Sequence, residues 1–221
     1  MTARNLIGAA FALGLACASP ALAGDPSGQD PSVQTGAPGP IGIALPSVNG
    51  RGAYVTQIGQ GDVARITQTA PNASASVRQD GERNEANVSQ EGTGTAFADL
   101  RQDGDRNNAL VAQDGAGQNV LYLTQTGYQN LAVAGQTANG AMHNGAILVQ
   151  TGQYNEMALV QDGSDNRAAL TQEGAGNGMT ASQTGDGNRL VWTQQGNNLP
   201  NLGVVQSGNQ AIQITQTGQG N

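Results

Sequence analysis

The sequence of 221 residues has few of the large side chains and few of the charges found in ordinary globular domains. Aromatic residues make up only 3% of the chain and charged residues only 11%, whereas glycine occurs 33 times. This composition provides little bulky apolar material for a conventional core, yet it lacks the high charge that is typical of disordered chains. Sixteen acidic residues against nine basic ones give a net charge of −7, which argues against a nucleic-acid partner.

Cysteine is also nearly absent, since Cys17 is the only one and lies in a segment with the features of an export signal. A positively charged start is followed by an apolar run, residues 6–18, and then by an A-x-A motif. We therefore expect a signal peptide over 1–23, cleaved between Ala23 and Gly24, rather than lipidation. The exported chain would have no cysteine for disulfides or thiolate metal sites. No later segment is apolar enough for a transmembrane helix, so stable membrane insertion is not expected.

Glutamine, by contrast, recurs through the rest of the chain at a nearly constant spacing. The steps are mostly eleven or twelve residues, with one of fourteen and one of ten. The positions are Gln57, Gln68, Gln79, Gln90, Gln102, Gln113, Gln125, Gln136, Gln150, Gln161, Gln172, Gln183, Gln194, Gln206 and Gln216. Apolar residues stand two and four places before each of them, which is the alternation of a β-strand. Each phrase is predicted to be one short strand with the glutamine and two apolar residues facing inward.

Between these strands the chain reads Gln-x-Gly-x-x-Asn, which predicts a tight turn. Glycine stands two places after thirteen of the fifteen glutamines, and Ala70 and Ala138 are the exceptions. Glycine most readily adopts the positive φ that a sharp reversal uses. The twelve turn glycines, which leave out the one after the last glutamine, are Gly59, Gly81, Gly92, Gly104, Gly115, Gly127, Gly152, Gly163, Gly174, Gly185, Gly196 and Gly208. Extra residues fall in the turns and leave the apolar spacing intact, as in a solenoid.

The repeat predicts an all-β, two-sheet β-solenoid over residues 50–221. Two strands and two turns, about 22 to 23 residues, would form one rung, and about seven rungs spaced about 4.8 Å apart would form a cross-β stack. Five of the eight prolines lie between residues 24 and 49, which we expect to be a flexible Pro/Gly-rich leader. No catalytic, metal-binding or cofactor-binding residue is predicted, because the only histidine, His143, lies in the longest turn without a matched acid or nucleophile.

The inward amides are predicted to form ladders that run through the stack. A buried amide is costly unless it is hydrogen-bonded, and in a solenoid the equivalent amide of the next rung lies one strand spacing away. Glutamine would thus stack on glutamine and asparagine on asparagine. The asparagines stand six places before the closing glutamine: Asn84, Asn107, Asn119, Asn130, Asn144, Asn155, Asn166, Asn177 and Asn188.

The phrase Gln-x-Gly-x-x-Asn-x-Ala-x-Val/Leu-x-Gln is matched at every marked place by residues 79–90, 102–113 and 161–172. In this phrase, over about residues 50–221, the chain resembles the curli subunits, which are secreted bacterial amyloid fibre proteins. The resemblance implies end-to-end stacking into biofilm and adhesive fibres at the cell surface. It also implies export from the periplasm through an outer-membrane pore, and a companion subunit or nucleator as a possible partner. The proline-rich segment differs from the family's usual Gly/Asn-rich leader, and the repeats do not separate a major subunit from a nucleator.

The two ends of the repeat and the charges in its turns indicate how the protein would assemble. Neither end of the repeat carries a capping element, which predicts polymerisation along the axis. The acids Asp80, Asp103, Asp114 and Asp162 are interpreted as gatekeepers that slow assembly, since two exposed like charges about 5 Å apart cost about 1 kcal/mol. Solvated turns that aid solubility are the other interpretation. A monomeric solenoid, either a surface adhesin or an ice- or carbohydrate-binding protein, is the alternative function, although the outward threonines are scattered over both sheets.

Overall fold

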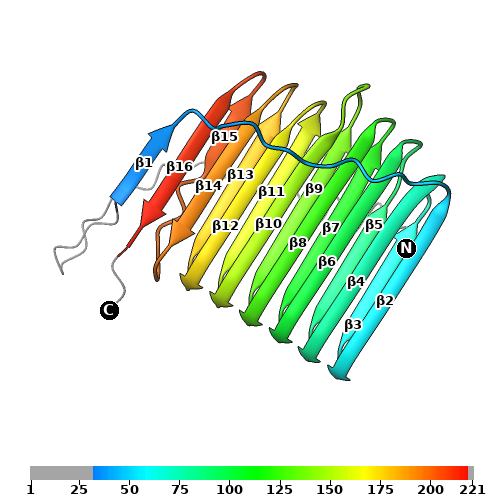
Figure 1. Cartoon of the computed structure of the whole chain (residues 1–221), viewed down its shortest axis with the longest axis horizontal. Coiled ribbons are helices and arrows are strands. Elements are labelled where there is room, and N and C mark those ends of the chain that lie inside the picture. Colours follow the sequence, from blue (N-terminus) through cyan, green and yellow to red (C-terminus); the bar gives the residue numbers. More distant parts are fainter. Residues whose placement is uncertain (1–31, 219–221) are drawn as a thin grey trace.

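The chain forms a two-sheet β-solenoid, seen here in a computed structural model that describes residues 32–218 (Figure 1). The larger sheet, sheet A, has nine strands in the order β1-β16-β14-β12-β10-β8-β6-β4-β2. The smaller one, sheet B, has seven strands in the order β15-β13-β11-β9-β7-β5-β3. From β2 onward consecutive strands alternate between the two sheets, as the repeat predicted. The fold class, all-β with about seven rungs, is confirmed.

The strands of sheet A are generally longer than those of sheet B. Sheet A comprises β1 (Ser32–Gly36), β2 (Arg51–Gln60), β4 (Asn72–Glu82), β6 (Thr95–Asp105), β8 (Gln118–Tyr128), β10 (Asn144–Gln153), β12 (Arg167–Ala175), β14 (Arg189–Gln195) and β16 (Ala211–Thr217). Sheet B comprises β3 (Val63–Gln68), β5 (Glu85–Gln90), β7 (Asn108–Gly115), β9 (Leu131–Ala138), β11 (Glu156–Gly163), β13 (Gly178–Thr184) and β15 (Val204–Ser207). Within the described residues no helix is long and apolar enough to cross a membrane.

Equivalent residues of successive rungs are paired in parallel and in register. Gln79, for example, pairs with Gln57 on one side and Gln102 on the other. The fourteen-residue step does not disturb this register, because Gln150 still pairs with Gln125. The extra residues of that step stay in the turn that precedes β10. This is the expected behaviour of a solenoid, in which insertions are accommodated outside the paired strands.

A thin apolar core fills the space between the two sheets. Burial alternates along the inner strands, as in β5, where every second residue is buried, whereas β1 and β2 are almost wholly exposed. In sheet A the leucines Leu100, Leu123, Leu148 and Leu170 are each at most 1% exposed and stand in one column. Trp192 continues this column in β14 and is completely buried. The period-two pattern of the sequence therefore corresponds to the buried face of each strand.

The turns begin later in the repeat than the sequence pattern indicates. Pairing in sheet A continues through the glycine that follows the glutamine by two places, and β4 ends only at Glu82. The chain reverses around the residue four places after the glutamine, which has positive φ in nine turns. In six of those turns it is not glycine: Arg83, Arg106, Gln129, Tyr154, Asp165 and Asn198. The sequence did not reveal this second left-handed position, because only three of the nine residues that adopt it, Gly61, Gly176 and Gly187, are glycine.

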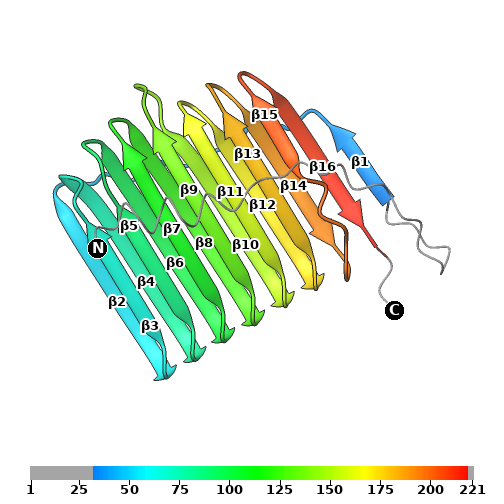
Figure 2. The ribbon, with the colours of Figure 1, turned by 180° about the vertical axis from the view of Figure 1, so that it is seen from behind.

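Residues 32–49 depart from the expectation of a flexible leader. β1 pairs antiparallel with β16 at the edge of sheet A, a placement also visible from behind (Figure 2). Residues 37–49, called the strap below, then cross the outer face of sheet A from β1 to β2 (Figure 1). The strap is held because Ile41 and Ile43 are buried against this face. The signal peptide over 1–23, its cleavage between Ala23 and Gly24, and residues 24–31 lie outside the described residues.

Candidate functional site: amide ladders, turn glycines and the two ends of the stack

All fifteen glutamines take part in two unbroken hydrogen-bonded ladders, one in each sheet. In every link the Nε2 of one glutamine donates to the Oε1 of the next, at 2.7 to 2.9 Å. The sheet A ladder runs Gln57, Gln79, Gln102, Gln125, Gln150, Gln172, Gln194, Gln216. The sheet B ladder runs Gln68, Gln90, Gln113, Gln136, Gln161, Gln183, Gln206. The ladders thus cross the whole stack without an unpaired inner member.

The second amide proton of each glutamine after the first fixes the direction of the ladders. It donates to the backbone carbonyl of one of the first three residues of the preceding strand, except in Gln216, whose acceptor is the Pro200 carbonyl. Gln79 Nε2, for example, donates to the Val63 carbonyl at 3.1 Å, and Gln90 Nε2 donates to the Ser74 carbonyl at 3.0 Å. Because a carbonyl can only accept, the nitrogen must face it and the oxygen must face the previous rung. Every ladder therefore has a donor end at β15 and β16 and an acceptor end at β2 and β3.

The asparagines join successive rungs mainly through the backbone, which differs from the predicted stacking of amide on amide. Asn84 Oδ1 accepts the Asn107 backbone N–H at 3.0 Å, and Asn84 Nδ2 donates to the Gly104 carbonyl of the next rung at 2.7 Å. The same pattern recurs along this column at Asn107, Asn130, Asn155 and Asn177. A second column, Asn144, Asn166 and Asn188, accepts the backbone N–H of the following rung in the same way. Direct amide–amide contacts accompany only some of these links.

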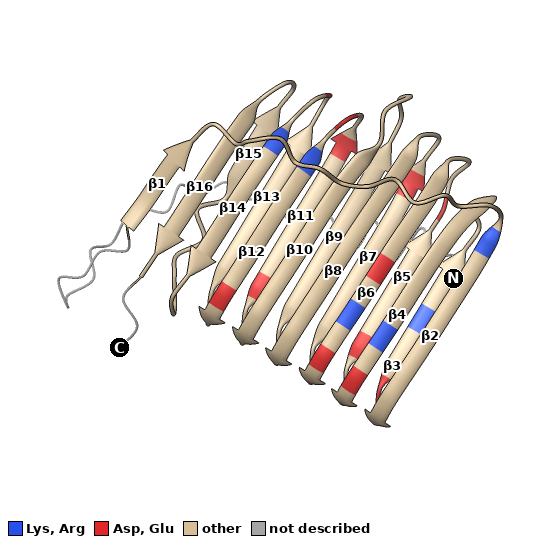
Figure 3. Ribbon diagram, viewed as in Figure 1, with Lys and Arg blue, Asp and Glu red and all other residues tan. Residues whose placement is uncertain are grey.

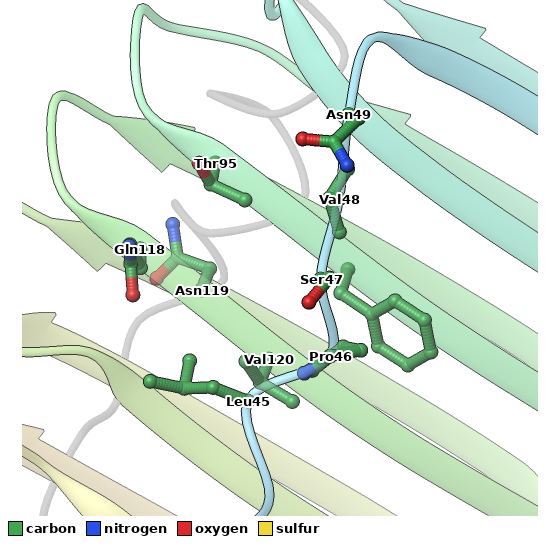
Figure 4. Close-up of a pocket in the computed structure, with 10 residues that line it drawn as sticks. Leu45, Pro46, Ser47, Val48, Asn49, Thr95, Gln118, Asn119 and Val120 are labelled. Atoms are coloured by element: carbon green, nitrogen blue, oxygen red, sulfur yellow. The ribbon is translucent and has the colours of Figure 1, made fainter.

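Asn119 is the one predicted ladder asparagine that makes no hydrogen bond to the next rung of its column. Its Nδ2 donates to the Asp114 carbonyl at 2.7 Å, but its buried Oδ1 has no hydrogen-bond partner. The next asparagine, Asn144, follows the fourteen-residue step and is the register partner of Asn119. Asn119 also lines a cavity of about 350 Å³ between the strap and the start of β8 (Figure 4).

The turn glycines are required by two constraints, of which the sequence indicated only one. All twelve have positive φ, between 67° and 139°. In addition, a Cβ added to Gly104 would lie 2.2 Å from the Gly127 carbonyl oxygen, and one added to Gly127 would lie 2.1 Å from that of Gly152. Such an approach is far inside van der Waals contact. Glycine therefore lets the rungs approach to hydrogen-bonding distance as well as letting the chain turn.

The four acids singled out from the sequence lie on outward turn positions and face different surroundings. Asp80 and Asp103 are register partners, and each lies beside an arginine of its own strand, Arg78 at 3.9 Å and Arg101 at 3.2 Å. These ion pairs are about half exposed, so they contribute little stability, but they offset the repulsion between the two carboxylates. Charged residues lie on β2 to β7 and on β11, β12 and β14, whereas β8, β9 and β10 carry none (Figure 3).

Asp162 faces no acidic register partner, whereas Asp114 has Glu91 beside it on one side, since the Glu91 N–H donates to the Gln113 carbonyl. Asp114 pairs with Thr137, and Asp162 pairs with Thr137 and Thr184. Their role as gatekeepers stays a prediction.

The two ends of the stack are not equivalent. At the start, the inward residues of β2 have no rung below them, and Val55 is 49% exposed. At the other end, the inward residues Ile214 and Gln216 of β16 are 6% and 0% exposed, and β1 lies along this strand. The sequence predicted two unprotected ends. The structure corrects this for one of the two edges of sheet A, because β1 covers the outer edge of β16.

A repeat with this length is known from a protein family. The sequence model of the curlin associated repeat matches residues 143–174, which span β10, β11 and most of β12. Residues 143–174 therefore carry a curlin associated repeat. No curated protein and no solved structure matches it significantly, so the assignment rests on the repeat and agrees with the solenoid. Both fit a subunit of a curli-like amyloid, a class of structural rather than enzymatic proteins.

The curlin-repeat solenoid carries a docking site for its own strap on the outer face of sheet A. A Cβ on Gly145, at the start of β10, would lie 2.8 Å from Ile43 Cδ1, so the missing side chain makes room for Ile43. Val120 is buried with the two isoleucines, and Ile147 and Val191 pack at the same cluster. The sequence showed these last two as apolar residues at outward positions, which was the one signal that something covers this face.

Polar contacts fix the strap at the same place. Arg167 Nη1 donates to the Ile41 carbonyl at 3.0 Å, and His143 forms a hydrogen bond with the backbone of Ile43. His143 is 8% exposed and its Nε2 has no partner. Burial lowers the pKa of His143 most, the charge of Arg167 and, less strongly, that of Arg189 lower it further, and Asp165 and the Ile43 hydrogen bond offset part of this. The lowered pKa favours the neutral imidazole beneath the docked strap.

Docking of the strap in this curlin-repeat protein is expected to weaken in mild acid. The pKa of His143 lies below 6.5 when the strap is docked and returns towards 6.5 when the imidazole is exposed. The undocked state then binds more protons, so docking is fully stable above about pH 6.5 and weakens as the pH falls below it. Hydrogen exchange of residues 37–49, corrected for the intrinsic rate, should show lower protection at pH 5.5 than at pH 7.5.

The matched control is His143→Gln, which keeps a hydrogen-bonding side chain but does not titrate. Its strap protection should not change between these two pH values. An equal loss of protection in the parent and in His143→Gln would assign the effect to the carboxylates and contradict this account.

Proposed function

We propose that this protein is a secreted structural subunit of curli-like extracellular amyloid fibres, which assemble by end-to-end stacking of solenoids at the cell surface. The observation that carries the proposal is the polarity of the glutamine ladders. One end of each ladder offers amide donors and the other offers amide acceptors, so two copies are complementary only head to tail. A head-to-tail contact repeats without closing and therefore generates a filament.

The junction between two copies follows from the internal register. Gln216 of one copy would donate to Gln57 of the next, and Gln206 would donate to Gln68, which continues both ladders. β16 would then pair in parallel with the next copy's β2 through the seven residues that it presents to β14. The exposed inward face of β2, with Val55 half exposed, would become buried as it is in every inner rung. Each junction would add backbone hydrogen bonds, two ladder links and apolar contacts.

We further propose that the fibres serve in biofilm formation and adhesion. The chain would be exported through the periplasm and an outer-membrane pore. A second copy of the chain is the principal partner, and a companion subunit or nucleator is a further one. The curlin repeat and the matched ends support this role.

The proposal is tested by incubating the purified exported form. We expect fibres that bind thioflavin T and give a cross-β reflection at about 4.7 Å along the fibre axis. A protein that stays monomeric on a sizing column at all concentrations would contradict the proposal and favour a monomeric binding protein.

A single glycine tests the predicted junction. Gly208 has a φ of +67° and nothing within 4 Å of an added Cβ, because no rung follows it within the chain. In the fibre its neighbour would be Ala70 of the next copy. The internal pair Gly115 and Ala138 has the same residue types, and there an added Cβ lies 2.1 Å from the carbonyl oxygen. Gly208→Ala should therefore cost the monomer only about 1 kcal/mol from the left-handed backbone, while fibre growth slows strongly.

Gly203→Ala is the matched control. Gly203 has a φ of +61° and also has nothing within 4 Å of an added Cβ, and it directly precedes β15, whereas Gly208 directly follows it. It should lower monomer stability by a similar amount without blocking growth. Equal growth rates for the two variants would contradict the proposed junction.

A further inference from the structure

The edge of β16, where the next copy must pair, is already occupied by β1 of the same chain. Ser32 pairs with Thr217, Val33 with Gln216 and Thr35 with Ile214 in an antiparallel register. The Ser32 and Thr217 hydroxyls are hydrogen-bonded to each other. Within the described residues, the pair of β1 and β16 is the only antiparallel one, and all other strand pairs are parallel. An edge strand can pair with only one strand on its free side, so β1 and an incoming β2 exclude each other.

β1 is a weak competitor for this edge. All five of its residues are exposed, so it contributes backbone hydrogen bonds but almost no burial. The incoming β2 would pair through seven positions and bring inward Ala53, Val55 and Gln57 over Ile212, Ile214 and Gln216. Antiparallel pairing also leaves the column of matched residues unfilled, since Val33 lies opposite Gln216. β1 can therefore cover the edge reversibly without outcompeting a correctly placed second copy.

The strap has the length needed to deliver β1 to the far end of the stack. β1 and β2 are eight strand intervals apart in sheet A, which is about 38 Å at a spacing of about 4.8 Å. Residues 37–50 contain three prolines, and fourteen residues in an extended polyproline-type conformation span about 43 Å. Little length is left over. The Ile43 contact at Gly145 and the Arg167 contact at Ile41 fix the middle of the strap on the way.

We propose that β1 is a removable cap on the growing edge of sheet A. β2 of a second copy of this chain competes with β1 for the edge of β16. This inference rests on the proposed stacking function and adds a control step to it. The cap covers sheet A only, because the outer edge of β15 in sheet B has no described partner strand. An incoming copy would pair first with the free edge of β15 and then displace β1 from β16.

A reversible disulfide tests the cap in the full exported chain. Ser32→Cys with Thr217→Cys places two thiols at directly opposed positions, where cross-strand Cα separations of about 4.5 to 5.5 Å are within the range that a disulfide bridges. Cys17 is replaced by serine wherever the signal peptide is retained. We expect the oxidised protein to lose growth onto preformed parent seeds, and reduction to restore the parent rate in the same sample. Equal growth of the oxidised and reduced forms would overturn the proposal.

A second pair of variants tests the cap without a crosslink. Only alternate N–H groups of an antiparallel strand point at its partner, so Gln34→Pro with Thr35→Pro removes at least one ladder donor from β1. Only molecules in which β1 has left β16 can bind the next copy, so the apparent affinity is reduced by the fraction of such molecules. Weakening β1 should therefore raise the rate of seeded growth by about tenfold or more. The β16 amides of the monomer should also lose exchange protection. The control is Gln34→Ala with Thr35→Ala, which retains both N–H groups and should behave as the parent.

The outcomes separate this inference from the proposed function. If the parent forms fibres and the proline and alanine pairs grow at the same rate, the cap is refuted and the stacking function stands. If none of these proteins forms fibres, including the reduced cysteine variant and the proline pair, both are refuted.

Discussion

Gly127→Ala is expected to lower the stability of the monomer by about 3 kcal/mol or more. Gly127 has a φ of +113°, and an added Cβ would lie 2.1 Å from the Gly152 carbonyl oxygen and 3.0 Å from its carbonyl carbon. The left-handed backbone alone costs about 1 to 2 kcal/mol for a residue with a Cβ. The clash adds a packing cost of about 1 to 3 kcal/mol, because the rungs on both sides must move apart.

The measurement is urea unfolding of freshly prepared monomer, followed by the fluorescence of the buried Trp192. With a slope of about 2 kcal/mol per molar urea, a loss of this size shifts the midpoint by about 1.5 M. Gly208→Ala is the internal comparison, because it shares the positive φ and the place in the repeat but has nothing within 4 Å of its added Cβ. Equal midpoints for the two variants would show that φ alone selects glycine in these turns.

This comparison also shows what the sequence could and could not reveal. The phase between glutamine and the apolar positions was sufficient to predict strands, sheets and rung length, because a residue repeated once per half-rung has only one consistent placement. The approach of Gly104 to Gly127 was not accessible in this way, since it depends on distances between rungs. The same holds for Arg83 and Gln129, whose left-handed conformations are imposed by the backbone of the neighbouring rungs and leave no trace in residue type.

The docking of the strap could not be predicted from the sequence for a different reason. Its prolines predicted a flexible leader, and its two buried residues, Ile41 and Ile43, are too few to form a periodic pattern. The docking site is a hole at Gly145 together with Val120 and Ile147, which lie more than seventy residues further along the chain. Such a contact joins an aperiodic segment to a repeat, so periodicity cannot predict it. It reverses the conclusion drawn from the ends, because an edge that looked open is covered in the folded chain.

Gln125→Glu is expected to be the most disruptive single substitution in the ladders, at about 4 kcal/mol near neutral pH. Gln125 is completely buried, and its Nε2 donates to Gln150 Oε1, to the Asn108 carbonyl and to the Asn130 carbonyl at 2.9 to 3.1 Å. A carboxylate at this site is close to the same volume but turns an oxygen towards three acceptors. The loss of an N–H is compounded by a buried, unpaired charge, for which about 3 to 5 kcal/mol is typical.

The destabilisation caused by Gln125→Glu should depend on pH in a defined direction. Burial and the facing oxygens would raise the pKa of the introduced carboxyl above its value in the unfolded chain, so the folded state binds the additional proton. The deficit relative to the parent should therefore be largest near pH 7 and shrink as the pH falls through the raised pKa. The protonated group supplies one O–H donor in place of two N–H donors, so recovery should stay incomplete. Difference unfolding curves of the variant against the parent at several pH values measure this.

The control for this substitution is Gln57→Glu at the acceptor end of the same ladder. Gln57 is exposed and its Nε2 makes a single contact, to Gln79 Oε1 at 2.7 Å. Solvent would hydrate the introduced carboxylate there, so we expect a loss of less than about 1 kcal/mol with little pH dependence in the monomer. In the fibre the same position becomes internal, because Gln216 of the preceding copy donates to it. The charge should then slow assembly far more than it destabilises the monomer, and an unaffected rate of growth would contradict both the ladder polarity and the head-to-tail junction.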